Sequence, residues 1–163
     1  MLVLIPISNQ SFLVQYYYLQ LYLISTQEIL DLLSGPKSKF LDLESIRYDS
    51  DLDQILLTSE GHILSQKDPS FFSISPNGQT QNTFQIPDAF KSNSIQKPRH
   101  NATLEGLCMA SDKKGYWLGM ELPLEADGPE PQYTQTKSPV RLTYIPSKTK
   151  EPEKQFAYFL DPV

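Results

Sequence analysis

The sequence predicts an all-β fold in which four-stranded antiparallel sheets repeat along the chain, as in a β-propeller. Two observations predict it: two apolar hairpins recur at a constant offset, and each is followed by two further strand-like segments. Thirteen prolines against seven glycines also favour many short elements over long helices. Because a closed propeller needs roughly four to eight blades, we expect two complete blades and an incomplete third, which together form a fragment of a propeller.

Four glutamates mark the repeat. Glu44 and Glu60 are separated by the same stretch of sequence as Glu105 and Glu121, so the second unit repeats the first at a constant offset. Each pair brackets two apolar runs joined by a Ser-Asp turn, which is the pattern of an antiparallel hairpin. Such a hairpin brings its two ends together. We therefore expect both glutamates of a pair at one end of the ladder and, if they pair directly, with Cβ atoms roughly 4.5–5.5 Å apart.

Eight strands are expected from β-favouring runs bounded by turn residues. They span residues 43–48, 54–59, 71–74, 83–86, 104–109, 116–120, 140–145 and 155–159. These strands belong to a repeat domain over residues 40–163. Residues 1–39 form an N-terminal segment with a strand over 12–24 and a short capped helix over 27–33, and the part before residue 19 could come from a misplaced start.

Composition and charge exclude several function classes. A hydrophobic content of 39% is typical of a globular domain, whereas a net charge of −5 without a Lys/Arg cluster argues against a nucleic-acid surface. Cys108 is the only cysteine, which excludes an internal disulfide and a cysteine metal site, and we expect it to be buried in its apolar strand. The apolar run 1–7 is too short to span a membrane and lacks the basic start of a signal peptide, so no compartment is assigned.

Three interpretations of the glutamates compete. In a propeller, Glu44, Glu60, Glu105 and Glu121 would gather at one mouth of the channel, with Asp127 as a further candidate ligand. The first interpretation is a hard-cation site, best suited to Ca²⁺, which could polarise a phosphate ester and activate water. The second is a metal-free pair of general acid and base. The third is structural, with the carboxylates accepting backbone hydrogen bonds where blades meet.

Four acidic motifs make the sequence resemble a known family, the esterase-like activity of phytase family, also called the phytase-like domain. The motifs D-x-E-[GS]-[IL], S-E-G, N-x-G-F-E-G-L and E-x-P-L-x-x-D-G are matched at residues 42–46, 59–61, 101–107 and 121–128. The third match departs from the pattern at Thr103 and Leu104, where the family usually has glycine and phenylalanine. The resemblance covers about residues 40–163.

The resemblance implies a β-propeller hydrolase that acts on small-molecule phosphate esters through a ring of acidic residues. Its catalytic residues would be Glu44, Glu60, Glu105 and Glu121. Proteins of this kind are often exported, and the remaining blades of the propeller would be partners of this chain. The alternative function is a non-catalytic propeller fragment for binding or scaffolding, with structural glutamates.

Overall fold

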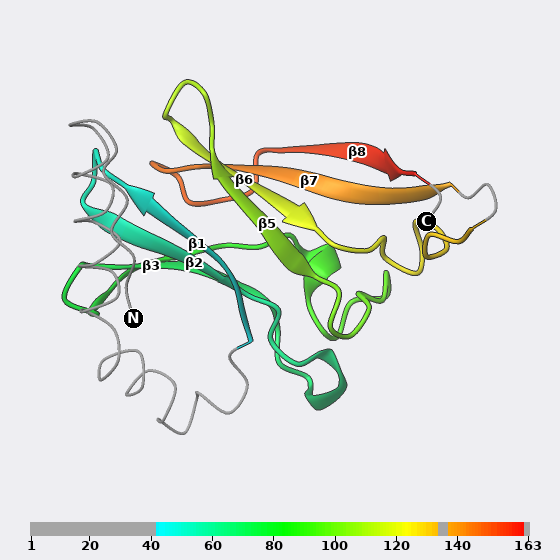
Figure 1. Cartoon of the computed structure of the whole chain (residues 1–163). Coiled ribbons are helices and arrows are strands. Elements are labelled where there is room, and N and C mark those ends of the chain that lie inside the picture. Colours follow the sequence, from blue (N-terminus) through cyan, green and yellow to red (C-terminus); the bar gives the residue numbers. More distant parts are fainter. Residues whose placement is uncertain (1–41, 134–136, 162–163) are drawn as a thin grey trace, which may run out of the picture.

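The computed structural model describes residues 42–133 and 137–161. It contains two four-stranded antiparallel sheets with the orders β1-β2-β3-β4 and β5-β6-β7-β8 (Figure 1). The first sheet consists of β1 (Leu43–Asp49), β2 (Gln54–Ser59), β3 (Ser70–Ile74) and β4 (Thr80–Phe84). The second consists of β5 (Leu104–Met109), β6 (Gly115–Met120), β7 (Ser138–Pro146) and β8 (Lys154–Leu160). Two 3-10 helices, η2 (Ile63–Ser65) and η3 (Asp88–Phe90), follow β2 and β4.

This architecture confirms the all-β prediction, and the two sheets are consistent with propeller blades. Within the described ranges the sheets do not close into a ring, and no helix there is long and apolar enough to cross a membrane. The expected strand over 12–24, the expected helix over 27–33 and the incomplete third blade lie outside the described residues.

The fourth strand lies earlier than predicted. It spans Thr80–Phe84 and not residues 83–86. The turn before it is tight and ends before residue 80, so the polar residues that follow the turn already belong to the strand. Ser75 closes that turn by accepting a backbone hydrogen bond from Gly78 at 2.9 Å. Beyond the strand, the N–H of Gln85 leaves the ladder and donates to the carbonyl of Lys150 in the second repeat, at 2.8 Å. The other strand predictions agree closely with the structure at both ends.

Each repeat carries a β-bulge at the same position. The register of β1 shifts at Glu44 and that of β5 shifts at Glu105. A bulge sets two residues of one strand against one residue of its partner. Glu44 and Glu60, and likewise Glu105 and Glu121, therefore do not pair directly, so the condition for the expected Cβ separation is not met. Each pair does lie at one end of its hairpin, as expected.

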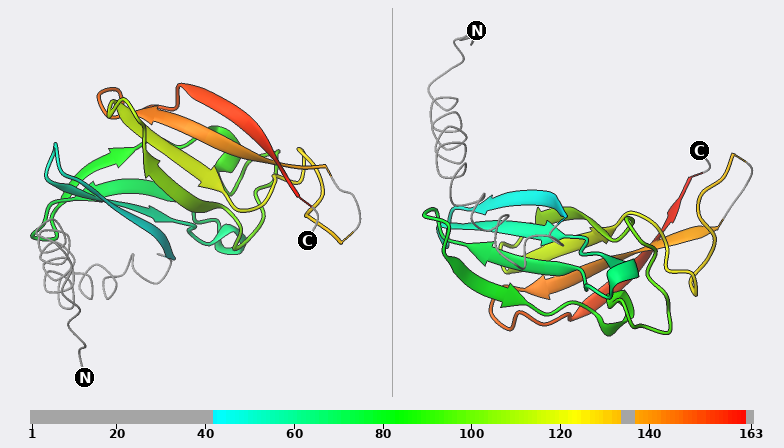
Figure 2. Two further views of the ribbon diagram at one scale, coloured as in Figure 1. Left: turned by 45° about the horizontal axis from the view of Figure 1, so that its top comes forward. Right: turned by 90° about the horizontal axis from the view of Figure 1, so that it is seen from below.

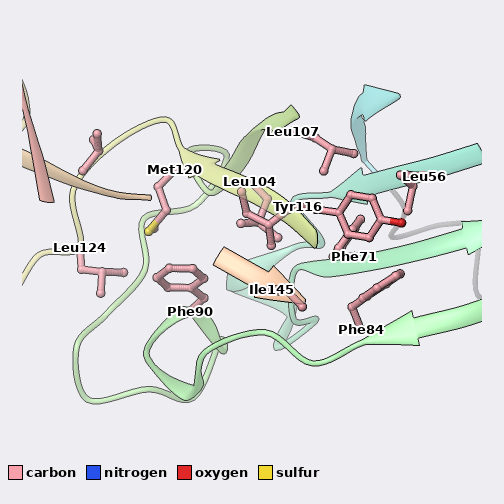
Figure 3. Close-up of a cluster of buried hydrophobic side chains, with 12 residues drawn as sticks. Leu56, Phe71, Phe84, Phe90, Leu104, Leu107, Tyr116, Met120, Leu124 and Ile145 are labelled. Atoms are coloured by element: carbon pink, nitrogen blue, oxygen red, sulfur yellow. The ribbon is translucent and has the colours of Figure 1, made fainter. Parts of the chain in front are cut away.

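The two sheets pack against each other, as Figure 2 shows from two directions. The main core cluster contains Leu56, Phe71 and Phe84 from the first sheet and Leu104, Leu107, Tyr116, Leu118, Met120, Val140 and Ile145 from the second, with Phe90 and Leu124 from the connections (Figure 3). Phe71 and Phe84 stack with ring centroids 4.1 Å apart, and both meet Tyr116 edge-on at 5.6 and 5.5 Å. Edge-to-face packing of this kind stabilises aromatic pairs beyond their area burial.

Tyr116 also makes a buried polar contact between the sheets. Its hydroxyl donates to Asp49 Oδ2 at 2.6 Å, while Asp49 Oδ1 accepts from the backbone N–H groups of Asp51 and Leu52 at 3.0 and 3.2 Å. Burial and this hydrogen bond to a carboxylate raise the pKa of Tyr116. The phenol therefore stays neutral, and one aspartate both orders the β1–β2 turn and fixes the second sheet against the first.

Cys108 is exposed, so the prediction that it is buried is wrong. It alternates along β5 with Leu107, which is in the core. Successive side chains of a strand point to opposite faces. Cys108 therefore lies on the face of the second sheet that is turned away from the first.

Replacing Tyr116 by phenylalanine tests this contact. Tyr116→Phe keeps the ring packing but leaves Asp49 Oδ2 buried without its donor, so we expect a loss of about 1–3 kcal/mol in the free energy of unfolding. Urea denaturation measures the loss. Tyr158→Phe, at an exposed tyrosine of β8, is the matched control and should change stability by less than about 0.5 kcal/mol. Equal effects of the two substitutions would contradict this role of Tyr116.

Candidate functional site: an acidic cluster at the ends of two hairpins

The four predicted glutamates lie together. Glu60, Glu105 and Glu121 each offer a carboxylate oxygen within 4.8 Å of the others, and Asp42, Glu44 and Glu60 form a second such group. These five residues are called the acidic cluster below. Glu60 belongs to both groups, so it is the centre of the cluster.

The cluster forms because the inner strands of the two repeats lie side by side. β1 and β5 run next to each other (Figure 1), and the Ser45 hydroxyl donates to the carbonyl of Glu105 across them. The bulges at Glu44 and Glu105 fall at this junction. Since bulges redirect side chains at the ends of ladders, they bring both glutamates toward the same place.

Glu60 and Glu121 end their hairpins in the same way. The N–H of Glu60 donates to the carbonyl of Asp42, and the N–H of Glu121 donates to that of Thr103, both at 2.9 Å. The offset of the repeat maps Asp42 onto Thr103. The two positions are thus equivalent in backbone structure, and only the first of them adds a carboxylate to the cluster.

Glu60 is the buried member of the cluster, with 2% of its surface exposed. Its Oε1 accepts a hydrogen bond from the N–H of Thr103, and the Thr103 hydroxyl donates to the Glu60 carbonyl at 3.3 Å. Its Oε2 has no hydrogen-bond partner, and among the described residues it is the only buried side-chain nitrogen or oxygen of which this is true. A buried polar atom without a partner is costly, so Oε2 calls for a proton or a cation.

The chain must turn sharply after Glu60, and Gly61 permits this. Gly61 has a φ of +68°, and a Cβ there would lie 2.4 Å from the carbonyl oxygen of Asp68 and 2.6 Å from that of Lys67. Only glycine tolerates both the positive φ and the close approach. The glycine of the S-E-G motif therefore fixes how the buried glutamate enters the cluster.

The electrostatics of the cluster favour the neutral forms of Glu44, Glu60 and Glu105. Burial raises the pKa of Glu60 to about 7 against the opposing hydrogen bond from Thr103, and the charges of Glu105, Glu44 and Glu121 raise it further. Desolvation, followed by neighbouring carboxylates, also raises the pKa values of Glu44 and Glu105. Like charges held this close disfavour one another's ionisation, so ionising Glu44, Glu60 and Glu105 together is unfavourable.

Asp127 is not brought into either group of the cluster. Its carboxylate forms two hydrogen bonds with Arg141, at 2.6 Å to Nε and 2.8 Å to Nη2, and Arg141 Nη2 also donates to Gln96 Oε1 at 2.6 Å. Such a bidentate pair is geometrically specific and strong. In the structure Asp127 therefore holds the connection between β6 and β7 against β7.

Sequence reasoning missed Asp42 and Thr103 as site residues. Asp42 stands at the start of the D-x-E motif that contains Glu44, and the repeat offset maps it onto Thr103. The motif and the repeat offset are both present in the sequence, so Asp42 could have been predicted as a member of the site. Thr103 was visible only as a departure from the family pattern, because its contribution to Glu60 comes from its backbone N–H and its hydroxyl.

The raised pKa of Glu60 predicts how stability depends on pH when no divalent cation is present. A carboxyl group whose pKa is higher in the folded state than the ordinary 4.5 stabilises the fold below pH 4.5, and this contribution is lost as the pH rises through about 7. Glu60→Gln removes the charge and retains an oxygen for the Thr103 N–H. In EDTA it should match the wild type near pH 4.5 and exceed it by up to about 3 kcal/mol at pH 8.

Glu125→Gln is the control for this experiment. Glu125 is a half-exposed carboxylate outside the cluster, ion-paired with Lys97 at 3.6 Å. Its substitution should leave the pH profile of unfolding unchanged. Parallel profiles for the wild type and Glu60→Gln would show that Glu60 does not titrate as its burial requires.

Comparison with known proteins identifies a family. A family model described as Phytase-like, esterase-like activity of phytase, matches residues 17–163. The match begins at residue 17, whereas the first of the acidic motifs begins at residue 42. A search of curated proteins and a search of solved structures each gave no significant match.

Proposed function

The chain belongs to the phytase-like family, and from this premise we propose that it is a hydrolase domain for phosphate esters whose acidic cluster holds a hard cation, Ca²⁺ or a similar ion. The observation that carries the proposal is the buried Oε2 of Glu60, which has no partner among the described residues although Glu60 belongs to both carboxylate groups of the acidic cluster. A cation would satisfy this atom and offset the charges of several carboxylates at the same time, whereas a proton on Glu60 removes only the charge of Glu60.

The donor set of the cluster suits such an ion. All five side chains offer carboxylate oxygens, which are the ligands that Ca²⁺ and Mg²⁺ prefer, whereas zinc and copper favour nitrogen or sulfur. The two groups share Glu60. Asp42, Glu44 and Glu60 would hold a cation on one side, and Glu60, Glu105 and Glu121 would hold one on the other.

The members of the acidic cluster differ in burial, and this difference suggests different roles for them. Asp42, Glu44, Glu105 and Glu121 are exposed, so a small ester can reach them, whereas Glu60 is buried. A phosphate ester is itself anionic, and the bare carboxylates would repel it. When bound, a hard cation would polarise the phosphate oxygens and lower the pKa of a bound water. Glu60, with its pKa raised to about 7, can hold a proton at neutral pH whenever no cation neutralises it.

A specific observation favours a second function, that of a non-catalytic binding or scaffolding domain. Glu60 Oε1 accepts the backbone N–H of Thr103 from the other repeat. A carboxylate that joins two repeats in this way can be retained for structure alone. In that case the cluster would tolerate its repulsion by protonation, and neither cation binding nor turnover would follow.

Cation binding has a thermodynamic signature. At about 100 times its dissociation constant a ligand specific for the folded state adds roughly 2.7 kcal/mol to the free energy of unfolding. We therefore expect Ca²⁺ to raise the Tm of the chain at pH 8, and EDTA to reverse the rise. Glu60→Gln and Glu105→Gln should lose most of it, while Glu125→Gln should retain it. A Tm that is the same with Ca²⁺ and with EDTA would rule out the metal interpretation.

Turnover separates the two functions. We expect hydrolysis of an aryl phosphodiester or aryl phosphate that depends on Ca²⁺ and is abolished by both Glu44→Gln and Glu105→Gln. Asp127→Asn, outside the cluster, should lower activity only as far as it lowers stability. If Ca²⁺ raises the Tm and no phosphate ester is hydrolysed, the cluster is a cation site of a non-catalytic domain.

A further inference from the structure

Two buried hydroxyl groups support the first group of the acidic cluster, the one formed by Asp42, Glu44 and Glu60. They belong to Thr58 and Ser59, the last two residues of β2, and 0% of either residue is exposed. Neither side chain offers a carboxylate. Both of their hydroxyl oxygens, however, accept backbone N–H groups from the segment that carries the first two acids.

The Ser59 hydroxyl lies between the backbone of Asp42 and the backbone that follows Glu60. Its Oγ accepts the N–H of Asp42 and the N–H of Gly61, each at 3.1 Å, and so uses both lone pairs of a hydroxyl oxygen. The N–H of Glu60 donates in turn to the carbonyl of Asp42 at 2.9 Å. These three hydrogen bonds tie Asp42 to Glu60 and to the residues on both sides of it.

The Thr58 hydroxyl has the corresponding role on the other side of Glu44. Leu43 pairs with Ser59 and Ser45 pairs with Thr58, so Glu44 is the extra residue of the bulge. Oγ1 of Thr58 accepts the N–H of Ser45 at 3.1 Å. Because a bulge disrupts the ladder locally, hydroxyl acceptors on both sides of it restrict the positions that the Glu44 side chain can take.

The second repeat has a bulge without these hydroxyls. The constant offset maps Thr58 onto Gly119 and Ser59 onto Met120, and neither of these has a side-chain oxygen. The register nevertheless shifts at Glu105 in the same way. The two hydroxyls are therefore not needed to form the bulge, which indicates that they serve a feature of the first repeat alone.

That feature is the carboxylate of Asp42. The offset maps Asp42 onto Thr103, so the N–H groups of these two residues are equivalent. The N–H of Thr103 donates to Glu60 Oε1, whereas the N–H of Asp42 donates to the Ser59 hydroxyl. A serine acceptor thus occurs at the repeat in which this position adds a ligand to the cluster.

We propose that the hydroxyls of Thr58 and Ser59 are positioning groups of the cation site, which hold the carboxylates of Asp42 and Glu44 within chelating distance of Glu60. The inference rests on the function proposed above, which supplies the cation. It adds two residues that do not touch the ion and act through the ligands that do.

The spacing of the first group shows why such support matters. Carboxylate oxygens bind Ca²⁺ at about 2.3–2.6 Å, so two oxygens on one ion lie at most about 5 Å apart. Oxygens of Asp42, Glu44 and Glu60 lie within 4.8 Å of one another. Asp42 and Glu44 are exposed, so a fixed backbone reduces the conformational entropy that these side chains lose when the ion binds.

Removing each hydroxyl with little change of side-chain volume tests the proposal. Thr58→Val and Ser59→Ala should each weaken Ca²⁺ binding at pH 8 by about 10- to 100-fold, the usual effect of losing a group that orients a metal ligand. Isothermal titration calorimetry of the full chain measures the dissociation constant. Thr58→Ser retains the hydroxyl and should bind Ca²⁺ as the wild type does.

Two other buried hydroxyl residues are matched controls. Thr143 and Ser73 are also 0% exposed. The Thr143 hydroxyl accepts from Gln155, and the Ser73 hydroxyl bonds to Gln54 and Asn82. Thr143→Val and Ser73→Ala should lower the urea midpoint in EDTA about as much as the test substitutions, because each removes one buried hydroxyl. They should leave the Ca²⁺ dissociation constant unchanged.

A double-mutant cycle shows whether Ser59 acts through Asp42. When added to Asp42→Asn, Ser59→Ala should weaken Ca²⁺ binding much less than it does in the wild type, because the carboxylate that it positions is already gone. Amide hydrogen exchange in EDTA gives a readout without the metal. The N–H of Asp42 should exchange faster in Ser59→Ala, and that of Ser45 faster in Thr58→Val, whereas Ser73→Ala should change neither.

The outcomes separate this inference from the function on which it rests. If the wild type binds Ca²⁺ and the variants Thr58→Val and Ser59→Ala bind it equally well, the inference is wrong while the proposed function stands. Control substitutions that weaken binding as much as the test substitutions would also overturn it, as would additive effects of Ser59→Ala and Asp42→Asn. If the wild type binds no Ca²⁺, the proposed function fails and this inference fails with it.

Discussion

The contact between Glu60 and Thr103 joins the two repeats where a carboxylate is buried at their junction. A carboxylate from the end of one hairpin is buried, and one of its oxygens accepts a backbone N–H from the start of the next repeat. The other oxygen has no partner among the described residues. Because an uncompensated buried charge costs several kcal/mol, this arrangement is stable only when a proton or a cation completes it.

The other carboxylates of the site gather around Glu60 because the inner strands of the two repeats meet there. Both inner strands bulge at the same position, which brings Glu44 and Glu105 to the junction. Tyr116 and Asp49 join the two sheets at the turn end of the first hairpin, so the alignment of the hairpins does not rest on the acidic cluster alone. The fold thus fixes the acidic groups before any ligand arrives, which is the preorganisation that a cation or substrate site requires.

The sequence predicted much of this arrangement because it is repetitive. The constant offset between glutamate pairs was enough to identify two hairpins, their strands and the convergence of four carboxylates. The bulges could not be predicted, because they fall at the first residues of β1 and β5, where too little of the strand lies beyond the shift to change its apolar pattern. Thr103 was missed because it acts largely through an N–H group, which every residue except proline can supply.

The error at Cys108 has a related cause. An apolar strand face that packs on a core and one that is left partly uncovered have the same alternating pattern in the sequence. Cys108 and Trp117 lie on the second kind of face, and only the structure distinguishes it from the first. Asp127 illustrates the opposite case, in which an acidic motif residue serves to hold a loop through Arg141.

The central claim is that Glu60 Oε2 receives a hard cation at the junction of the repeats. Anomalous diffraction from crystals grown with Mn²⁺ or Tb³⁺ in place of Ca²⁺ tests it most directly, because the scattering locates the ion itself. The claim predicts a peak within about 2.6 Å of Glu60 Oε2, with oxygens of at least two other members of the acidic cluster around it. Ion peaks elsewhere on the molecule and none at Glu60, in crystals that contain the metal, would contradict it.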